Sequence, residues 1–316
     1  MPVGAQGSAF KLYSIQEATE NVAPAGNWGQ MPCFTFGVGA DQELSQDEIL
    51  SANANRDPAD PFYGKVTVEG AARVPLDTTH FGRWLRMLLG APVTSGTTNY
   101  THVWKSGSTA LPSQAFEKSF PDIGRVEQYL GCRANTLDVG ISDTGGADAT
   151  VGLLGMQEIT AGASGAGTPI VTPFVRFQRP QGLVRLNETT LAAVTGGTIR
   201  FSNDMAAVDD TIRADDQVEG VDFGQAKASG DLTLRFLSHA QVDLAIAKTP
   251  VAVEYSLTID ANRSLTFLFP RAFLQRRGRA VDGPRGLSMT LPFIASHDPT
   301  SAAMMVVTLK NQVAAY

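Results

Sequence analysis

Side chains suited to catalysis or metal binding are sparse in this sequence. The four histidines are His80, His102, His239 and His297. None stands in an HExxH pattern or at another paired-ligand spacing, so we interpret them as structural residues rather than metal ligands. No G-x-S-x-G elbow, P-loop or dinucleotide fingerprint is present. The sequence therefore predicts no catalytic residues, no metal site and no cofactor.

The densest group of carboxylates falls within residues 203–225, which we predict to be a long polar loop. Its members are Asp209, Asp210, Asp215, Asp216, Glu219 and Asp222. Calcium binding is one hypothesis, although the spacing lacks the D-x-D-x-D-G order and closing Glu of an EF-hand. A solvated loop is the second, and electrostatic docking against a neighbouring copy is the third.

A second acidic stretch covers residues 39–61. It carries Asp41, Glu43, Asp57 and Asp60, and a loop of this length is usually functional or disordered. The densest basic group lies at residues 271–285, and its docking candidates are Arg276, Arg277 and Arg279. These arginines either meet acidic loops of another copy or belong to a solvated hairpin. Exposed ion pairs add only about 0–1 kcal/mol each, so such docking would set register more than affinity.

Composition narrows the class of protein. The chain has 316 residues, 43% hydrophobic and 18% charged, with 31 glycines and 17 prolines. This mixture is typical of a β-rich protein with many turns, and the low charge density suggests a surface covered by further copies. The net charge of −6 argues against a protein that grips nucleic acid through its phosphates.

The two cysteines and the N-terminal sequence bear on where the protein is made. Cys33 and Cys132 show no metal spacing. Two reduced, buried thiols are our first interpretation, and a disulfide is the alternative. No signal peptide is recognisable and no apolar run is long enough to cross a membrane. We therefore expect assembly in a cytoplasm and no membrane insertion.

One helix is predicted with its packing face. Phe81, Trp84, Leu85 and Leu88 fall at i, i+3, i+4 and i+7, which places them on one apolar stripe. The Asp77-Thr78 pair is a suitable N-cap. Burial of each large side chain is worth roughly 1.5–3 kcal/mol, so the helix is expected to pack on a sheet.

Strands dominate the remaining sequence. Within residues 115–142, the apolar Leu137, Val139 and Ile141 alternate with small or polar residues, which indicates a strand with one buried face. We predict other strands at residues 32–38, 65–69, 100–105, 114–120 and 149–159 in the first half, and at 198–202, 231–236, 251–260, 264–274, 286–296 and 304–310 in the second. A short second helix is predicted after Ser238.

Both halves thus have the order strand, long acidic loop, strand, helix and four strands, which suggests an internal duplication. We expect a mainly β fold with two tandem β-sandwich or barrel-like domains, each with one packed helix and long loops. The expected divisions are an extended arm at 1–30 that needs a neighbouring surface, a first domain at 31–160, a Gly/Ala-rich linker at 161–175 and a second domain at 176–316.

Several scaffold segments occur in a fixed order along the chain. They are Leu-Leu-Gly at 88–90, FEKSFPDIGRVEQYLGCRANTLDVGIS at 116–142, VGLLGMQEIT at 151–160, TIRFSND at 198–204, SGDLTLRF at 229–236, LTFLFPRAFL at 265–274, and MTLPFIASHD with VVTLKN between 289 and 311. Through these segments, from about residue 60 onward, the sequence resembles the tail tube (major tail) proteins of phages with long, non-contractile tails.

The resemblance implies a structural virion protein rather than an enzyme. Such subunits join edge to edge into rings, and the rings stack into a tube through which the genome passes. A duplicated subunit implies a trimeric ring acting as a pseudo-hexamer, with a hexamer as the alternative. Further implied partners are a tail terminator, baseplate or distal tail proteins, and the tape measure protein and DNA inside the lumen. The acidic residues Asp41, Glu43, Asp57, Asp60, Asp209, Asp210, Asp215 and Asp216 become candidates for contacts between rings.

Two expectations follow for the channel and for competing functions. Strand positions that face the lumen should be neutral or acidic on average, so that DNA slides. The alternatives are the inner tube of a contractile tail, a hydrolase with an acid/base pair that we do not identify, and a carbohydrate- or receptor-binding β-sandwich. The last needs exposed aromatic residues, for which Trp28 and Trp104 are the candidates.

Overall fold

A computed structural model describes residues 4–50, 53, 55–191, 193–278 and 286–316. The protein is mainly β, with 50% of residues in strands and 7% in helices, and its sheets are open rather than closed into a barrel. The helices are α1 (Phe81–Leu89), α2 (Ala240–Ala247) and the short 3-10 helix η1 (Arg179–Gln181). No helix among the described residues is long and apolar enough to span a membrane.

The strands of the first half are β1 (Lys11–Gln16), β2 (Gly29–Gln30), β3 (Thr35–Phe36), β4 (Gly39–Ser45), β5 (Phe62–Pro75), β6 (Val93–Ser95), β7 (Tyr100–Lys105), β8 (Gln114–Phe120), β9 (Arg125–Ser142), β10 (Asp148–Gly155) and β11 (Gln157–Ala161). Those of the second half are β12 (Gly182–Leu186), β13 (Thr189–Thr190), β14 (Val194–Ser202), β15 (Ala206–Ala207), β16 (Val221–Asp222), β17 (Lys227–Arg235), β18 (Val251–Asp260), β19 (Arg263–Leu274), β20 (Ser288–Ala295) and β21 (Val306–Asn311).

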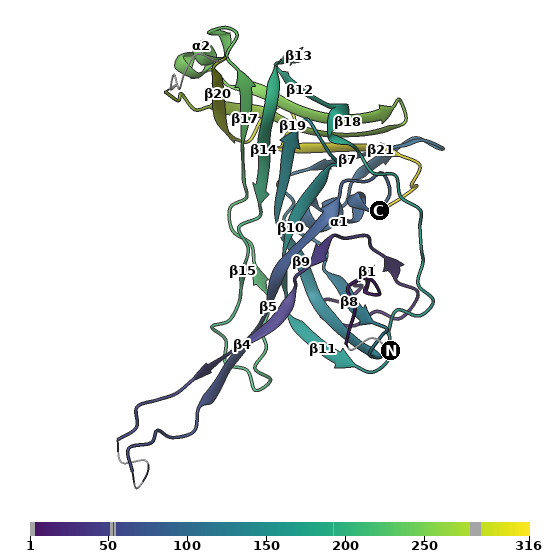
Figure 1. Cartoon of the computed structure of the whole chain (residues 1–316), viewed down its shortest axis with the longest axis vertical. Coiled ribbons are helices and arrows are strands. Elements are labelled where there is room, and N and C mark those ends of the chain that lie inside the picture. The colour runs from purple at the N-terminus through teal and green to yellow at the C-terminus, as the bar shows by residue number, and fades with distance from the viewer. Residues whose placement is uncertain (1–3, 51–52, 54, 192, 279–285) are drawn as a thin grey trace.

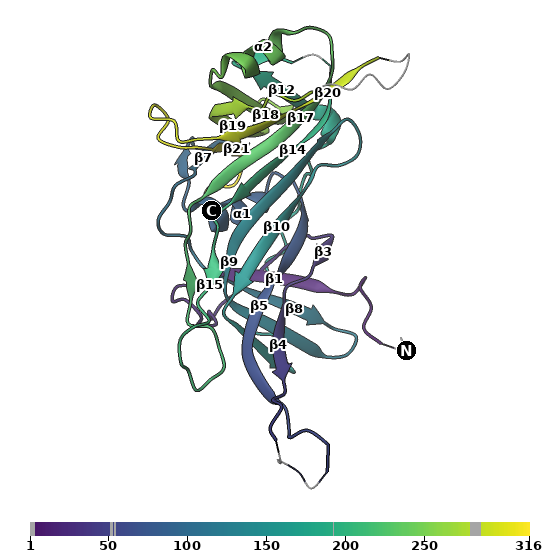
Figure 2. The ribbon, with the colours of Figure 1, turned by 90° about the vertical axis from the view of Figure 1, so that its left-hand side faces the viewer.

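The largest structural unit is a twisted sheet that runs through both halves. Its neighbouring strands are β4, β5, β10, β9, β14, β17, β20 and β19, all antiparallel. We call this eight-strand run the central sheet. It extends along the long axis of the molecule, from the β4–β5 hairpin at one end to β20 and α2 at the other (Figures 1 and 2).

The pairing order of the first half recurs in the second. In the central sheet, β4–β5–β10–β9 is followed by β14–β17–β20–β19. Outside it, β1–β8–β9–β11 corresponds to β12–β18–β19–β21. In each half, one long strand (β9 or β19) therefore belongs to both layers.

One hydrophobic core joins the two halves. It includes Phe81, Trp84 and Leu137 of the first half together with Phe201 and Phe267 of the second. Alternation on the central strands explains this core, because every second side chain points to the side of the sheet that carries the helix and the outer strands. The expected domain limits at 31, 161 and 176 remain predictions.

Helix α1 is the most deeply buried helix. Phe81, Trp84, Leu85 and Leu88 are all at most 2% exposed, and the Trp84 ring stacks on Phe116 with ring centroids 5.4 Å apart. The Asp77 carboxylate accepts the backbone N–H groups of His80 and Phe81 at 2.8–3.1 Å. It therefore satisfies the first turn of the helix, although the residue at the cap position itself is His80.

Three sequence expectations differ from the structure. Residues 149–159 form two strands instead of one, because β10 pairs with β5 in the central sheet and β11 turns away to pair with the first part of β9. Residues 39–45 are strand β4 rather than loop. Residues 32–38 contain only the two-residue strand β3.

The N-terminal region and the linker region are held by contacts within the chain. β1 pairs with β8 along its length, from Lys11–Ser119 to Gln16–Gln114. Trp28 is 1% exposed and its backbone N–H bonds to the carbonyl of Ala166. Ser164 Oγ and the Gly165 N–H both donate to the Glu117 carboxylate. Residues 11–16 and 27–30 are thus ordered without a neighbouring subunit.

Candidate functional site

The acidic candidates gather at one end of the molecule. The hairpin of β4 and β5 projects far beyond the sheet, and the connection between β14 and β17 extends in the same direction beside it (Figures 1 and 2). Asp41 and Glu43 lie on β4, and Asp57 and Asp60 lie near the hairpin tip. Asp209, Asp210, Asp215 and Asp216 lie on the second connection, beyond the short β15–β16 ladder.

Direct contacts join these two projections. The Val66 N–H donates to the Asp216 carbonyl at 2.8 Å, and the Lys65 ammonium donates to the Thr211 carbonyl. Val66 and Gln217 form a parallel bridge at the point where β10 has ended and left this edge of β5 open. The two connections therefore act as one projecting structure, which residue order alone did not indicate.

Local ion pairs neutralise part of the charge in the projections. The Arg213 guanidinium donates two hydrogen bonds to the Asp215 carboxylate, at 2.6 and 2.9 Å. The hydrogen bonding from Arg213 is the main reason that the pKa of Asp215 is lowered to about 2. Among the described residues, no three His, Cys, Asp or Glu side chains converge in a way that could hold a metal ion. The geometry gives the calcium hypothesis no support.

Large apolar side chains accompany the acidic ones. Leu44, Phe62 and Tyr63 of the hairpin strands are 51–68% exposed, and Leu50 near the tip is 92% exposed. On the second projection, Ile212 is fully exposed. Exposed apolar groups rimmed by charge typically mark a surface that contacts another protein.

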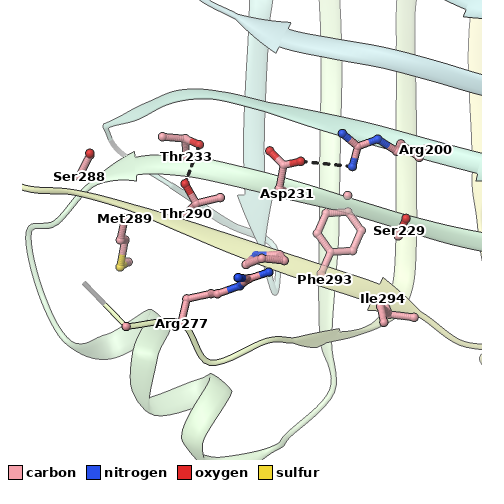
Figure 3. Close-up of a pocket in the computed structure, with 13 residues that line it drawn as sticks. Arg200, Ser229, Asp231, Thr233, Arg277, Ser288, Met289, Thr290, Phe293 and Ile294 are labelled. Atoms are coloured by element: carbon pink, nitrogen blue, oxygen red, sulfur yellow. Dashed lines mark hydrogen bonds and ion pairs between the residues drawn. The ribbon is translucent and has the colours of Figure 1, made fainter. Parts of the chain in front are cut away.

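The basic candidates lie at the opposite end. Arg276 and Arg277 follow β19 and are exposed, whereas Arg279 lies outside the described residues. Arg277 borders an open hollow of about 770 Å³ on the outer side of β17 and β20 (Figure 3). Its side chain extends across β20 toward Phe293. The exposed Ile294, Leu237 and Ile246 lie on or beside the same end.

The outer face of the central sheet is mostly polar around β9, β14 and β17, whereas Phe273 and Ile294 are exposed on it at the β19–β20 edge. Because directly paired residues share a face, the register places small and hydroxylated side chains together on this side. They include Thr136, Thr150, Thr198, Ser202, Ser229, Thr233 and Thr290. We call this surface the polar face.

Each of three arginines on or beside the polar face has a carboxylate partner. Arg200 approaches Asp138 at 3.7 Å and Asp231 at 3.5 Å, and Arg73 and Arg179 both contact Asp148 at 2.5 Å. Burial raises the pKa of Asp138 while Arg200 opposes this shift. Around these three arginines the face therefore presents locally compensated charges.

The aromatic and histidine candidates have structural roles. Trp28 and Trp104 are 1% and 0% exposed, so neither can stack on a sugar at the surface. His80 Nδ1 lies 2.8 Å from the Asp77 carboxylate, which also caps α1. His102 contacts Thr94 and the Val313 carbonyl at 2.8 Å each, so it ties the C-terminal segment to β7.

Both cysteines are free thiols. Cys132 is fully buried, and burial raises its pKa; Cys33 is partly buried, and burial raises its pKa to about 11. Neither thiol has the lowered pKa of a reactive cysteine.

Comparison with known protein families identifies one matching family. The model of the phage tail tube protein family matches residues 7–295, which includes the polar face, both projections and most of the basic end. No curated protein matches the chain significantly.

Proposed function

Because the chain belongs to the phage tail tube protein family, we propose that it forms rings that stack into a hollow conduit for genome delivery. The carrying observation is that both long projections leave the same end of the molecule (Figure 1). Subunits arranged around a common axis would then present all their projections to the next ring. The exposed Leu44 and Leu50, flanked in the sequence by Glu43 and Asp57, provide an apolar contact with an acidic rim.

The recurring strand order supports a trimeric ring that acts as a pseudo-hexamer. Each half contributes four strands to the central sheet and one long connection at the projecting end. Three copies would therefore present six similar units around the axis. A six-copy ring is the alternative and predicts twice the mass per ring.

We assign the polar face to the wall of the channel. A surface in contact with passing DNA must not bind phosphates strongly, since each cation that pairs with a phosphate adds affinity. On this face Arg200 already pairs with Asp138 and Asp231, and the surrounding positions are mostly Thr, Ser and Gly. The arrangement fits a neutral, hydrated wall.

Electron microscopy of the purified full chain tests the assembly. We expect rings or tubes with a central channel. Replacement of residues 47–60 by a short Gly-Ser turn should leave rings that fail to stack, because only the projecting tip is removed. A matched control shortens residues 96–98, a turn between β6 and β7. A wild-type protein that stays monomeric under all assembly conditions would contradict the proposal.

The assignment of the channel wall has its own test. The double variant Asp138→Asn/Asp231→Asn removes both carboxylate partners of Arg200. If the polar face lines the channel, its tubes should retain duplex DNA at low salt and release it as salt rises. The control Asp122→Asn alters a carboxylate on the β8–β9 turn, away from this face. Equal DNA retention by both variants would reject the assignment.

The competing carbohydrate- or receptor-binding function has less support. Its candidate aromatic residues, Trp28 and Trp104, are buried in the structure. The inner tube of a contractile tail shares the same building principle. Microscopy of intact virions would separate it, since a contractile tail carries a sheath around the tube. The implied terminator, baseplate and tape measure partners, and assembly in the host cytoplasm, stay part of the proposal.

A further inference from the structure

Within the central sheet, the two halves are joined by one pair of strands. We use this pair as a template for a second junction, between copies. β9 of the first half pairs with β14 of the second, from Ser142–Gly196 to Thr136–Ser202. The pairing order assigns β19 the place of β9 and β4 the place of β14. If the halves are equivalent, a second junction of the same kind should join β19 to β4. Within one chain these strands are opposite edges of the central sheet, separated by six strands and roughly 34 Å at the usual strand spacing.

A shift in strand register that occurs in both halves shows which residues of the two halves correspond. The β8–β9 register shifts between Gln114–Cys132 and Phe116–Tyr129. The β18–β19 register shifts in the same way, between Val251–Ala272 and Val253–Phe269. Cys132 therefore corresponds to Ala272, and Arg133 to Phe273.

This alignment carries across the sheet without contradiction. One row of direct partners in the first half is Arg133, Leu154, Glu69 and Gly39. The corresponding row in the second half is Phe273, Ile294, Ser229 and Arg200. In the next row Gly70 corresponds to Gly230, and further along β10 and β20 Thr150 corresponds to Thr290, so identical residues stand at equivalent places.

Both edges are open in the single chain. Among the described residues, β4 pairs with β5 alone, and beyond Ala272 the edge of β19 opposite β20 carries no strand within residues 273–278. The Ala40 N–H points away from β5 and donates to the Glu158 carboxylate at 3.2 Å. The Glu158 side chain thus accepts the hydrogen bond that a carbonyl of a neighbouring strand would otherwise accept. Exposed edges of this kind are sites of pairing with another chain.

We propose that the β4 edge of one copy pairs antiparallel with residues 273–278 of the next copy, an inference that rests on the ring assembly proposed above. The register follows from the template. β9 carries one extra residue, Asn135, because its register with β10 shifts between Ala134–Leu153 and Thr136–Gly152. β19 has no such extra residue there, since the Gln275 N–H bonds to the Pro292 carbonyl directly after the Leu274–Phe293 pair. Thr136 therefore corresponds to Gln275, and Asp138 to Arg277. Arg200 opposite Asp138 becomes Gly39 opposite Arg277, and Ser202 opposite Thr136 becomes Asp41 opposite Gln275. The same contact repeated head to tail closes a ring, as heterologous interfaces do when the rotation closes.

Charge complementarity supports this register. In the template, Asp138 on β9 approaches Arg200 on β14 at 3.7 Å. In the proposed junction the signs are exchanged: Arg277 lies on the β19 side, and Asp41 lies diagonally opposite on the β4 side, within reach of a long side chain. Two of the sequence candidates, the basic Arg277 and the acidic Asp41, therefore meet between neighbours in one ring, and Asp41 belongs to this contact rather than to ring stacking.

Site-directed disulfide formation tests the register in the full chain with Cys33→Ser as background. The Ala40 N–H points toward the open edge, so the flanking Asp41 is at a non-hydrogen-bonded position, where Cα atoms of partners lie about 4.5 Å apart. This distance suits a disulfide. We expect assembled Asp41→Cys/Gln275→Cys protein to give covalent multimers on oxidation, seen in a non-reducing gel.

The matched control shifts one position by a single residue. In Ala40→Cys/Gln275→Cys the two side chains face opposite sides of the sheet, so cross-linking should fall at least several-fold. A charge exchange gives a second measurement: Arg277→Glu should slow ring formation, and the added Asp41→Arg should restore it.

The outcomes separate this inference from the proposed function. Multimers specific to the matched pair, with rescue by the charge exchange, support the junction. Tubes in the microscope with equal cross-linking of the matched and shifted pairs overturn the junction and leave the tube function intact. A wild-type protein that never forms rings overturns both.

Discussion

Helices α1 and α2 hold equivalent places in the two halves and differ greatly in burial. Each follows the strand of the long hairpin, β5 or β17, and each has a histidine at its N-cap, His80 or His239. Alignment from these caps places Phe81, Trp84 and Leu88 of α1 opposite the smaller or polar Ala240, Asp243 and Ala247 of α2. Seven residues of α1 are buried, against two of α2.

The difference follows from what covers each helix. The C-terminal Tyr316 packs on α1 so closely that a Cβ at Gly82 would lie 2.3 Å from its ring, and its hydroxyl donates to the Thr79 carbonyl at 2.8 Å. Within one copy α2 has no comparable cover among the described residues: its own Ile246 and the preceding Leu237 are exposed. The same topology thus builds a core in one half and leaves a largely exposed helix in the other. Four measurements test this difference between the two halves.

The largest effect is expected at Trp84. Trp84→Ala removes a buried ring that stacks on Phe116, and truncation of a buried Trp typically costs about 3–5 kcal/mol. Urea denaturation of the monomeric protein should show this loss in the free energy of unfolding. A loss below about 1 kcal/mol would mean that α1 is not the organising core element.

Asn203 tests how firmly the halves are joined. Its side-chain amide donates to the Leu88 carbonyl at 2.9 Å and the Ala134 carbonyl at 3.1 Å, and so links the second half to α1 and β9. Asn203→Ala removes both of these buried hydrogen bonds and should cost about 1–3 kcal/mol. Separate unfolding transitions for the two halves of the variant would show that this link holds them together; an unchanged stability would show that it does not.

The Cys33 thiol of the first half is expected to give a smaller effect, seen at alkaline pH. Burial raises the Cys33 pKa from 9.0 to about 11. Below pH 9 both folded and unfolded thiols are protonated, so no stability difference arises. Between about pH 9 and 11 the unfolded thiol ionises first, and stability should fall as pH rises. Cys33→Ser should show a shallower decline in thermal unfolding experiments; the same slope in both proteins would count against a buried thiol.

The smallest stability effect is expected at Ile246 of α2. This side chain is 47% exposed, so Ile246→Ala should change the unfolding free energy of the monomer by no more than about 0.5 kcal/mol. Ring or tube formation, followed by light scattering, should nevertheless slow if the α2 end contacts another copy. A stability loss of several kcal/mol would place Ile246 in a core instead.

Local sequence patterns determined much of the fold. The alternation in residues 126–142 matches most of β9, residues 251–260 match β18, and residues 81–88 lie within α1. These elements were predictable because a strand or helix with one buried face imposes a period of 2 or 3.6 on its own residues. The order of elements also suggested a repeated plan, which the recurring pairings now support.

Strands with weak patterns escaped prediction. β4 (GADQELS) lacks β-branched residues, and β1 holds the polar Ser14 in a buried position. Both are strands because of their partners: β4 lies against β5, and β1 against β8 about 100 residues away in the chain. Backbone pairing at such separation leaves no local periodic signal.

The candidate surfaces also have some features that could be predicted from the sequence and others that depend on the tertiary structure. The positions of the charged residues, the mainly β fold and the likeness to tail tube proteins could be predicted from residue types and their order. Long-range packing was needed to join two loops separated by more than 140 residues at Lys65 and Thr211, and to bring Arg200 close to Asp138 and Asp231. It also leaves β4 and residues 273–278 as open edges within the described part of the chain. These facts depend on strand register across the sheet, which is set by long-range packing rather than by neighbours in the chain.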